Sequence, residues 1–450
     1  MRKFILIVCM IIGFNTVVNF TQLNQLLATE QIVDREKLVE EGANIVLNLQ
    51  SGKFDKVIDT LDEQSKKIID APMLKTTWDN VVSLLGEYIE NESISGEVVD
   101  NSFVVTVIER YEHTGLKVQI TFTIETGKVS ALYFQYVTMD NKINNDILIE
   151  EAITIVADEK FPLSGILTVP KNIQNPPVVI MVQGSGATDK NETIYLNTPF
   201  KDIAYGLAEK GIATLRYDKR FYTYPMLENV TLREEVLDDV NAGIELLRAD
   251  NRIDSNQIYV LGHSLGGGLA PAIAKENADV KGLIIIAGTP RPIYEVSYDQ
   301  NKQVQKNLNI MNLDDLTLGI IREQLGQIEN DINVLRGDLS AVPDEQILLG
   351  LPASYQKSAK MYSAEEVIGN IDIPILVLQG NEDFQVNAEV DFVLWQTLLG
   401  DRENASFILY EGLNHLMMHS SGLKNIDEYK IKGEVSKQVI NDIASFINAL

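Results

Sequence analysis

The chain has 450 residues, of which 45% are hydrophobic and 23% are charged, and its formal net charge is −26. A chain of this length and composition is globular and long enough for two or three domains. Its negative charge repels nucleic-acid phosphates and anionic membrane surfaces, so the sequence predicts neither as a partner.

The N-terminus has the pattern of an export signal. Arg2 and Lys3 precede an uncharged apolar run from Phe4 to Phe14, and a polar stretch follows that ends at Ala28. Short positive segments followed by such runs are typical of secretory signals, whereas a membrane span needs about 20 apolar residues. We expect residues 1–28 to be cleaved and the protein to be secreted or held at the cell surface. The alternative is an uncleaved N-terminal anchor, which would be the chain's contact with a membrane.

The cysteine content limits the chemistry of the mature protein. Cys9 is the only cysteine, and it lies within the expected signal. Once the signal is removed, disulfides, thiol catalysis and cysteine-bound metal are excluded from the mature chain. The sequence implies neither a metal nor a cofactor.

Residues 29–140 are predicted to form a small α+β domain of their own. Helical patterns come first, at residues 34–49, 53–69 and 78–85, and strand-like runs follow at residues 102–111, 116–125 and 129–137. This order is typical of a helix layer packed on an antiparallel sheet. No catalytic cluster stands out here, so covering the active site, dimerisation and attachment to the cell wall are all open as roles.

Residues 141–450 are predicted to form the second domain, in which strands and helices alternate. An antiparallel pair at residues 149–156 and 164–169 comes first. The later strand-like runs are residues 178–182, 212–216, 257–261, 282–287, 373–378 and 406–410, and helices include residues 201–210, 232–247 and 433–447. This alternation predicts a doubly wound, mostly parallel sheet of the α/β class.

An insertion at about residues 289–370 interrupts this alternation. It is far longer than the usual connection between a strand and a helix. Apolar residues within it recur at helical spacing, so one face of this helix must be covered. These residues are Ile321, Leu325, Ile328, Ile332 and Leu335. We interpret the insertion as a helical cap over the active site, with a helix packed at the side of the sheet as the alternative.

Residues 262–266, Gly-His-Ser-Leu-Gly, are the most informative segment of the chain. They follow an apolar strand-like run and precede a helical one, which is the layout of a nucleophile elbow. In such a turn the serine is strained, and glycines flank it because a Cβ would collide with neighbouring backbone. Ser264 is therefore the candidate nucleophile. The amide of Leu265 lies at the start of the helix, where it can stabilise an oxyanion.

A serine hydroxyl at neutral pH needs a histidine base that is oriented by a carboxylate. Among the four histidines, His415 follows the last strand, from which a base reaches the elbow, and His419 is the alternative one helical turn later. Asp383 lies just beyond the preceding strand and is the candidate acid, with Glu382 as its rival. The chain order is then serine, acid and histidine, as such an elbow requires.

The second oxyanion donor is expected in the loop after the strand at residues 178–182. This loop reads Gln-Gly-Ser-Gly at residues 183–186, and its glycines permit the close backbone approach that such a donor needs. We assign the amide of Ser185, together with that of Leu265, to the oxyanion hole. The charged run at residues 216–220 is interpreted as a structural cluster of ion pairs rather than as a substrate site.

The elbow, the Gln-Gly-Ser-Gly loop, the Arg-Tyr-Asp-Lys-Arg run and residues 380–386 together resemble the α/β-hydrolase superfamily. More narrowly, the chain resembles bacterial two-domain serine carboxylesterases over about residues 147–450. The preceding domain is similar to a small α+β module of unknown function that is often found before such esterases. The resemblance implies Ser264 as nucleophile, Asp383 as acid and His415 as base.

We therefore expect a serine hydrolase that cleaves small carboxylic esters of short to medium acyl chains through an acyl-enzyme. A peptidase or amidase of the same fold is the first alternative, because the sequence does not locate the residues that set specificity. A non-catalytic surface-binding protein with a vestigial hydrolase domain is the second. The oligomeric state is not predicted.

Overall fold

The computed structural model describes residues 35–99, 102–137, 146–171, 173–224, 227, 231–307 and 315–450. The expected signal at residues 1–28, which contains Cys9, lies outside the described residues. Among the described helices, none combines the length and the apolar character needed to cross a membrane. The chain divides into two compact units between residues 137 and 146, and the short segment Thr193–Leu196 groups with the first unit.

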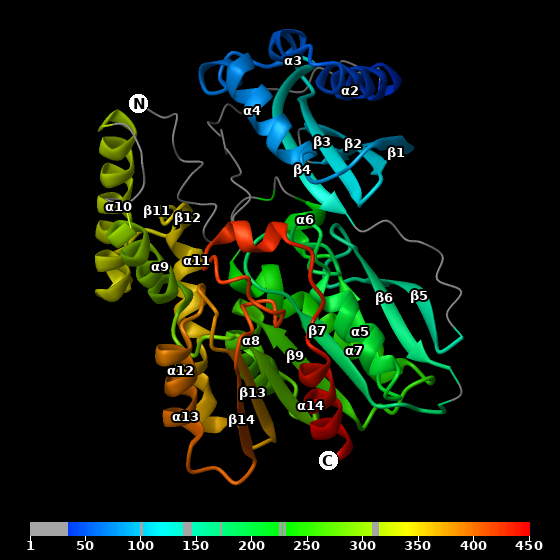
Figure 1. The fold of residues 1–450 in the computed structure, drawn as a ribbon, viewed down its shortest axis with the longest axis vertical. Coiled ribbons are helices and arrows are strands. Elements are labelled where there is room, and N and C mark those ends of the chain that lie inside the picture. Colours follow the sequence, from blue (N-terminus) through cyan, green and yellow to red (C-terminus); the bar gives the residue numbers. More distant parts are fainter. Residues whose placement is uncertain are drawn as a thin grey trace. The chain divides into compact units, whose positions relative to one another are not determined.

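The first unit is a layer of helices on a four-stranded antiparallel sheet (Figure 1). Its helices are α2 (Arg35–Gln50), α3 (Phe54–Thr60) and α4 (Ala71–Val82). Its strands, in sheet order, are β1 (Tyr88–Val99), β2 (Ser102–Tyr111), β3 (Gly115–Thr123) and β4 (Lys128–Val137). Helices and sheet share one apolar core, which includes Leu49, Trp78, Val118 and Phe122. The predicted α+β class of this unit is confirmed.

The helices of this unit differ in their bounds from the predicted ones. The helix predicted over residues 53–69 is wrong, because the chain leaves α3 at Thr60 and pairs briefly with β4. The amide of Asp62 donates to the carbonyl of Val129 at 2.9 Å, which ends the helical pattern. α4 begins seven residues before the predicted start, because the side chain of Asp70 caps it by accepting the amide of Met73 at 2.9 Å.

Strand β1 has no counterpart among the predicted strands. Its residues are exposed along nearly the whole length, so the sequence shows no alternation of apolar and polar positions. Backbone pairing with β2 holds it, in a register that runs from Tyr88 opposite Tyr111 to Val99 opposite Ser102. The formation of such a strand depends on pairing with its neighbour rather than on a pattern in its own sequence.

The second unit is built on an eight-stranded sheet with the order β14-β13-β10-β9-β7-β8-β6-β5. These strands are β5 (Leu148–Ile155), β6 (Leu163–Pro170), β7 (Val178–Val182), β8 (Ala213–Tyr217), β9 (Ile258–His263), β10 (Gly282–Ile286), β13 (Ile375–Gly380) and β14 (Ala405–Tyr410). The leading strand β5 pairs with β6, and β6 with β8, in antiparallel fashion, whereas the pairs among β7, β8, β9, β10, β13 and β14 are parallel. The predicted mostly parallel α/β sheet is confirmed, with β9 near its centre.

Helices cover both faces of this sheet (Figure 1). They are α5 (Pro199–Ala208), α6 (Arg220–Thr223), α7 (Asp238–Ala249), α8 (Leu265–Glu276), α13 (Val393–Leu399) and α14 (Lys437–Asn448), with π-helical turns at Arg233–Leu237 and Ala388–Phe392. α7 and α8 share one core with the strand residues Ile180 and Val260. α5 and α14 pack against each other so closely that a Cβ at Gly206 would lie 2.7 Å from Ile440. The buried central strands are therefore rigid supports for the turns at their ends.

The insertion after β10 consists mainly of helices. These are α9 (Ile293–Asn307), α10 (Asp315–Arg336), α11 (Ala353–Met361) and α12 (Ala364–Val367), with a hairpin of β11 (Ile347–Leu348) and β12 (Leu351–Pro352). α10 packs on α9 and buries Ile321, Leu325, Ile332 and Leu335, while Ile328 is half-buried. The covered face predicted for this helix is confirmed. α11 is attached to the sheet domain by Tyr355, whose hydroxyl donates to Glu235 at 2.6 Å.

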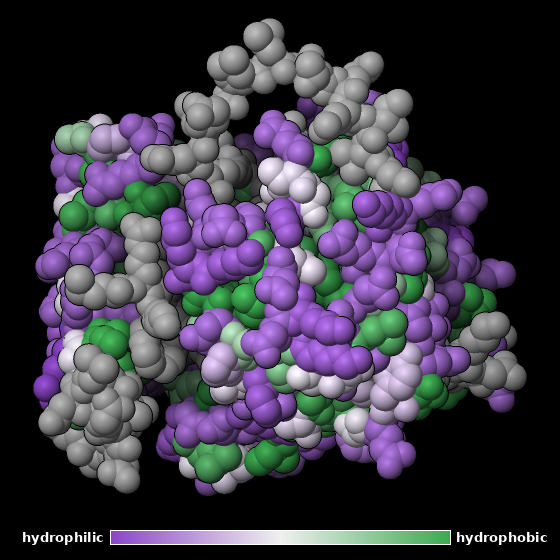
Figure 2. Space-filling model, turned by 90° about the horizontal axis from the view of Figure 1, so that it is seen from above, coloured by the Kyte–Doolittle hydropathy of each residue, from purple (hydrophilic) through white to green (hydrophobic). Residues whose placement is uncertain are grey.

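The described surface in Figure 2 is mostly hydrophilic. Apolar side chains on this face lie in small groups between the polar ones rather than in one broad area. This distribution fits a chain with a net charge of −26, which favours contact with water over the surface.

Candidate active site

Ser264 lies at the sharp turn between β9 and α8. Its backbone has a φ of 53° and a ψ of −115°, in a region that non-glycine residues rarely occupy. Glycine is required on both sides. A Cβ at Gly262 would lie 2.2 Å from the carbonyl oxygen of Gly266, and one at Gly266 would lie 2.2 Å from that of Val182. This strained turn has the geometry of a nucleophile elbow.

The first turn of α8 provides a backbone donor beside Ser264. The amide of Ser264 itself is occupied, because it donates to the carbonyl of Ile286 at 2.9 Å. Leu265 is the first helical residue, and the amides of a first turn have no acceptor within their own helix. With the helix dipole behind it, the Leu265 N–H can therefore stabilise negative charge on an oxygen held at Ser264.

His415 and Asp383 form a buried pair. Nδ1 of His415 lies 2.7 Å from Oδ2 of Asp383, and both side chains are almost fully inaccessible to solvent. The other carboxylate oxygen accepts the amides of Gln385 at 2.8 Å and Val386 at 2.9 Å, and Gln379 donates to Oδ2 at 2.9 Å. These donors hold the carboxylate rigidly, so that it fixes the proton of His415 on Nδ1 and leaves Nε2 as an acceptor.

The rival residues lie elsewhere. Glu382 forms an ion pair with Lys424 at 2.9 Å, so its carboxylate is turned to a different partner. His419 is exposed. His113 is exposed as well and belongs to the first unit. Of the candidates weighed from the sequence, His415 and Asp383 are the two that the structure brings together.

Ser185 and Ser264 line the same cavity. The loop of Ser185 approaches closely because residue 184 is glycine, where a Cβ would lie 3.1 Å from the Cβ of Ser264. Within the described part of the chain, the amide of Ser185 has no acceptor. Helix α9 of the insertion lines this cavity too, through side chains that include Val296 and Gln300.

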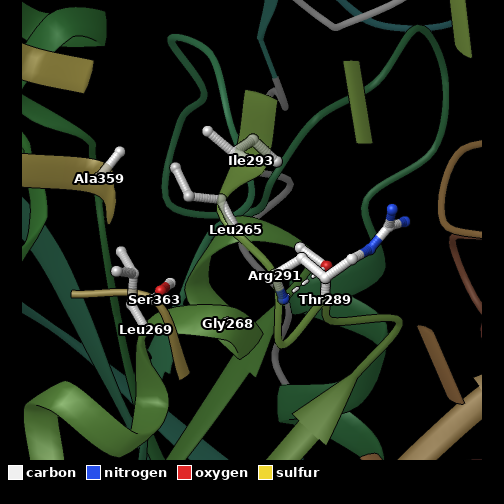
Figure 3. Close-up of a pocket in the computed structure, with 8 residues that line it drawn as sticks. All are labelled: Leu265, Gly268, Leu269, Thr289, Arg291, Ile293, Ala359 and Ser363. Carbon is white, nitrogen blue, oxygen red and sulfur yellow. Dashed lines mark hydrogen bonds between the residues drawn. The ribbon is translucent and has the colours of Figure 1, made fainter. Parts of the chain in front are cut away.

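A second cavity lies along α8 (Figure 3). Its lining residues are Leu265, Gly268, Leu269, Thr289, Arg291, Ile293, Ala359 and Ser363. The guanidinium of Arg291 points away from Leu269 and Ala359 and pairs with Asp391 at 2.9 Å. The space is therefore mostly apolar, and Ile293 borders both cavities.

A buried ion pair connects the parts of this site, and sequence reasoning missed it. Oε1 of Glu192 lies 2.9 Å from Nδ1 of His263 and accepts the amide of Gly184 at 2.7 Å. Nε2 of His263 donates to the backbone carbonyl of His415 at 2.9 Å, and the two imidazole rings are 4.6 Å apart between centroids. The pair thus ties the loop of Gly184, the elbow and His415 together.

No sequence pattern indicates this pair. Glu192 precedes His263 by 71 residues and lies in an irregular loop, where its backbone has a φ of 52°. A strained, buried carboxylate of this kind is recognisable only once the tertiary structure is known. The position of His263 next to the elbow serine was visible in the sequence, but its two hydrogen-bond partners were not.

The stability of the protein is expected to depend on pH through His263. Burial lowers the pKa of this histidine, but the charge of Glu192 and the hydrogen bonds to Glu192 and His415 outweigh burial and raise the pKa above the ordinary 6.5. A group whose pKa is raised by folding adds stability that is complete below its unfolded pKa and lost as pH rises through its folded pKa. Urea unfolding from slightly acidic to alkaline pH should therefore show the advantage of wild type over His263→Gln shrinking as pH rises. An advantage that grows with pH would contradict this assignment.

The charged run after β8 is a set of structural ion pairs, as the sequence predicted. Arg216 pairs with Glu150, and Arg220 pairs with the buried Asp239. Lys219 is buried as well, and its ammonium donates to the carbonyl oxygen of Gly184 at 2.8 Å. Through Lys219, this run therefore holds the loop of Gly184 and Ser185, which lies next to Ser264.

The two buried histidines of the site each have hydrogen-bond partners within the site. His415 is bound to Asp383, and His263 is bound to Glu192 and to a backbone carbonyl. Over the described residues, no group of three or more histidine, cysteine, aspartate or glutamate side chains is placed to hold a metal ion. What the arrangement can do chemically is activate a serine and stabilise an oxyanion.

Comparison with known proteins agrees with this chemistry. Residues 166–398 match the BD-FAE family, and residues 43–132 match a family described as a protein of unknown function, DUF3887. The chain is 31% identical over 415 residues to esterase EstD of Thermotoga maritima, which covers 91% of this chain and 95% of that protein. The chain belongs to this family of α/β-hydrolase esterases. It is a carboxylesterase whose hydrolase domain is preceded by a DUF3887 module.

Solved structures include more distant neighbours. Est1E from Butyrivibrio proteoclasticus is 19% identical, with a TM-score of 0.43 over 66% of this chain and 98% of that chain. The esterase domain of a Rhodothermus marinus protein is 17% identical, with a TM-score of 0.41 over 67% of this chain and 98% of that chain. The family assignment depends on the sequence matches and not on these two structures.

Proposed function

We propose that Ser264, His415 and Asp383 hydrolyse carboxylic esters of short to medium acyl chains through an acyl-enzyme. The observation that carries this proposal is the buried pair of His415 and Asp383, 2.7 Å apart, which is held against the elbow by the bond from His263 to the His415 carbonyl. This pair supplies what a weak serine nucleophile lacks, a base in a fixed orientation with a free Nε2.

In the acylation step, Oγ of Ser264 attacks the carbonyl carbon of the ester and Nε2 of His415 takes the hydroxyl proton. The amides of Leu265 and Ser185 donate to the oxyanion that forms, and each such donor typically contributes about 10²–10³ in rate. His415 then passes the proton to the leaving alcohol, and the C–O bond of the ester breaks. Asp383 stabilises the imidazolium while it carries the proton.

In the deacylation step, water replaces the alcohol. His415 takes a proton from the water, which attacks the acyl-enzyme, and the same two amides stabilise the second oxyanion. The proton then returns to Oγ of Ser264 as the acid leaves. The residues of the site supply every proton movement in this cycle.

The preference for short to medium acyl chains is supported by the cavity along α8. Its walls include the apolar side chains of Leu269, Ile293 and Ala359. The apolar lining next to the Leu265 amide suits an aliphatic chain whose carbonyl oxygen occupies the oxyanion hole.

We further propose that the protein is exported, on the evidence of the charged and apolar N-terminal pattern at residues 1–28. The substrate is then a small, uncharged ester met outside the cytoplasm. An uncharged substrate is favoured because the net charge of −26 repels anions.

A fluorophosphonate probe tests the proposed chemistry on the whole purified protein. We expect one covalent adduct, located at Ser264 by peptide mass spectrometry, because the probe reacts with a serine activated in this way. In parallel, p-nitrophenyl acetate and butyrate should be turned over faster than the palmitate ester and faster than aminoacyl anilides. Absence of the adduct would contradict the nucleophile, and faster cleavage of anilides would favour a peptidase or amidase instead.

A further inference from the structure

One side chain that lines the cavity beside Ser264 carries a buried oxygen without a partner. Gln300 on α9 is 8% exposed, and its Nε2 donates to the backbone carbonyl of Gln385 at 3.0 Å. A backbone carbonyl can only accept, so the orientation of the amide is determined and Oε1 must point away from it. Among the described residues, Oε1 of Gln300 has no hydrogen-bond donor.

An unpaired acceptor at this position costs the protein stability. A buried polar atom without a partner is unfavourable, and such atoms are uncommon in folded proteins. Two other polar groups of the same cavity are already used. The hydroxyl of Ser297 donates to the carbonyl of Ile293 at 3.3 Å, and the Gln385 side-chain amide donates to Tyr429. A ligand that brings a donor to Gln300 would remove this cost.

The leaving alcohol is assigned to this cavity, because the cavity reaches both Ser264 and the loop that holds Asp383. Its lining includes Gln385 and Val386, whose amides hold the carboxylate of Asp383. That carboxylate orients His415, which delivers a proton to the leaving oxygen. The cavity along α8, which contains Leu265 but not Ser264 or Gln385 in its lining, is left for the acyl chain.

The ligand group that donates to Oε1 of Gln300 is expected to be uncharged. No carboxylate lines the cavity, so an ammonium group bound there would be buried without a counter-charge. A hydroxyl can donate to Gln300 without bringing a net charge. The remaining lining, Ile293, Val296 and Val386, suits the carbon skeleton of a small alcohol.

We propose that Gln300 is a specificity-determining residue that accepts a hydrogen bond from a second hydroxyl on the alcohol portion of the substrate. The favoured substrates are then short-chain esters of an alcohol that carries at least two hydroxyl groups. This inference rests on the proposed function, because the site of the alcohol is defined by the roles of Ser264 and His415.

A pair of esters of equal size tests it. In 2-hydroxyethyl acetate the terminal methyl group of propyl acetate is replaced by a hydroxyl, and the acyl groups are identical. The measured quantity is the ratio of kcat/KM for the hydroxyethyl ester to that for the propyl ester, divided by the ratio of their rates of alkaline hydrolysis. For the wild-type protein we expect a value of about 5–100, which corresponds to the cost of one unpaired buried group. This comparison requires no variant.

Variants then assign the preference to Gln300. Gln300→Met keeps the length of the side chain and removes both polar atoms, so the preference should fall close to the ratio for alkaline hydrolysis while propyl acetate is still hydrolysed. Ser297→Ala is the matched control, since it changes the same cavity on the same helix but removes a hydroxyl that is already bonded; its preference should stay at the wild-type value.

The outcomes separate this inference from the proposed function. If the wild-type protein hydrolyses both esters and its kcat/KM ratio equals the ratio of alkaline hydrolysis, the role of Gln300 is contradicted while the proposed function stands. A preference that survives in Gln300→Met, or one found instead for methyl glycolate over methyl propionate, also overturns it, since the hydroxyl would then be recognised elsewhere or on the acyl side. Failure to hydrolyse either ester and failure to react with a fluorophosphonate contradict the proposed function itself.

Discussion

Ser264→Ala is expected to lower kcat for p-nitrophenyl acetate by about 10⁴–10⁶-fold, because without Oγ no acyl-enzyme can form and only binding and the oxyanion hole remain. The backbone at this position already has a φ of 53°, and alanine adopts this region no more easily than serine, so the strained turn is preserved at similar cost. Initial rates and the loss of fluorophosphonate labelling measure the effect.

The control for this experiment is Ser406→Ala on strand β14, an exposed serine outside both cavities. It should react with the probe and turn over the ester as wild type does. Both variants should unfold at nearly the wild-type temperature, since neither removes buried apolar groups. Turnover within a few-fold of wild type by Ser264→Ala, with the fold intact, would reject this serine as the nucleophile.

Asp383→Asn is expected to lower kcat by about 10³–10⁴-fold, because an asparagine would place the proton of His415 on the wrong nitrogen. The amides of Gln385 and Val386 can only donate, so they select the oxygen of the new side chain. The NH₂ group must then face Nδ1 of His415, which becomes an acceptor and leaves the proton on Nε2. A base in that tautomer cannot take the proton of Ser264.

The same substitution should also reduce stability. Gln379 now donates to Oδ2 of Asp383 at 2.9 Å and would instead face an NH₂ group, and since its amide also reaches the carbonyl oxygens of Gly380 and Val386 at 3.3 Å, we expect a loss of only about 1 kcal/mol. Urea unfolding measures this loss separately from kcat. Glu382→Gln is the matched control, because this neighbouring carboxylate pairs with Lys424 rather than with His415. If Glu382→Gln lost activity and Asp383→Asn kept it, the two acids would have to exchange roles.

The elements that the sequence predicted best carry strong local signals. Strand β7 (Val178–Val182) and strand β2 (Ser102–Tyr111) have the predicted bounds, because a strand buried in a sheet needs a run of apolar or alternating residues of matching length. Strand β1 (Tyr88–Val99) is exposed and had no such signal, so only its pairing with β2 defines it. The same distinction separates the well-predicted and missed parts of the site.

From sequence alone, the glycines around Ser264 and the order of serine, acid and histidine along the chain were enough to select the candidate residues and the class of fold. Steric exclusion of a Cβ at Gly262 and Gly266 is a short-range effect, so it leaves a mark in consecutive residues. Only the tertiary structure decided that Glu192 and His263 hold the site together and that Gln300 leaves an oxygen unpaired beside Ser264. Hydrogen bonds between residues far apart in the chain depend on distances that folding sets, and no spacing in a sequence records them.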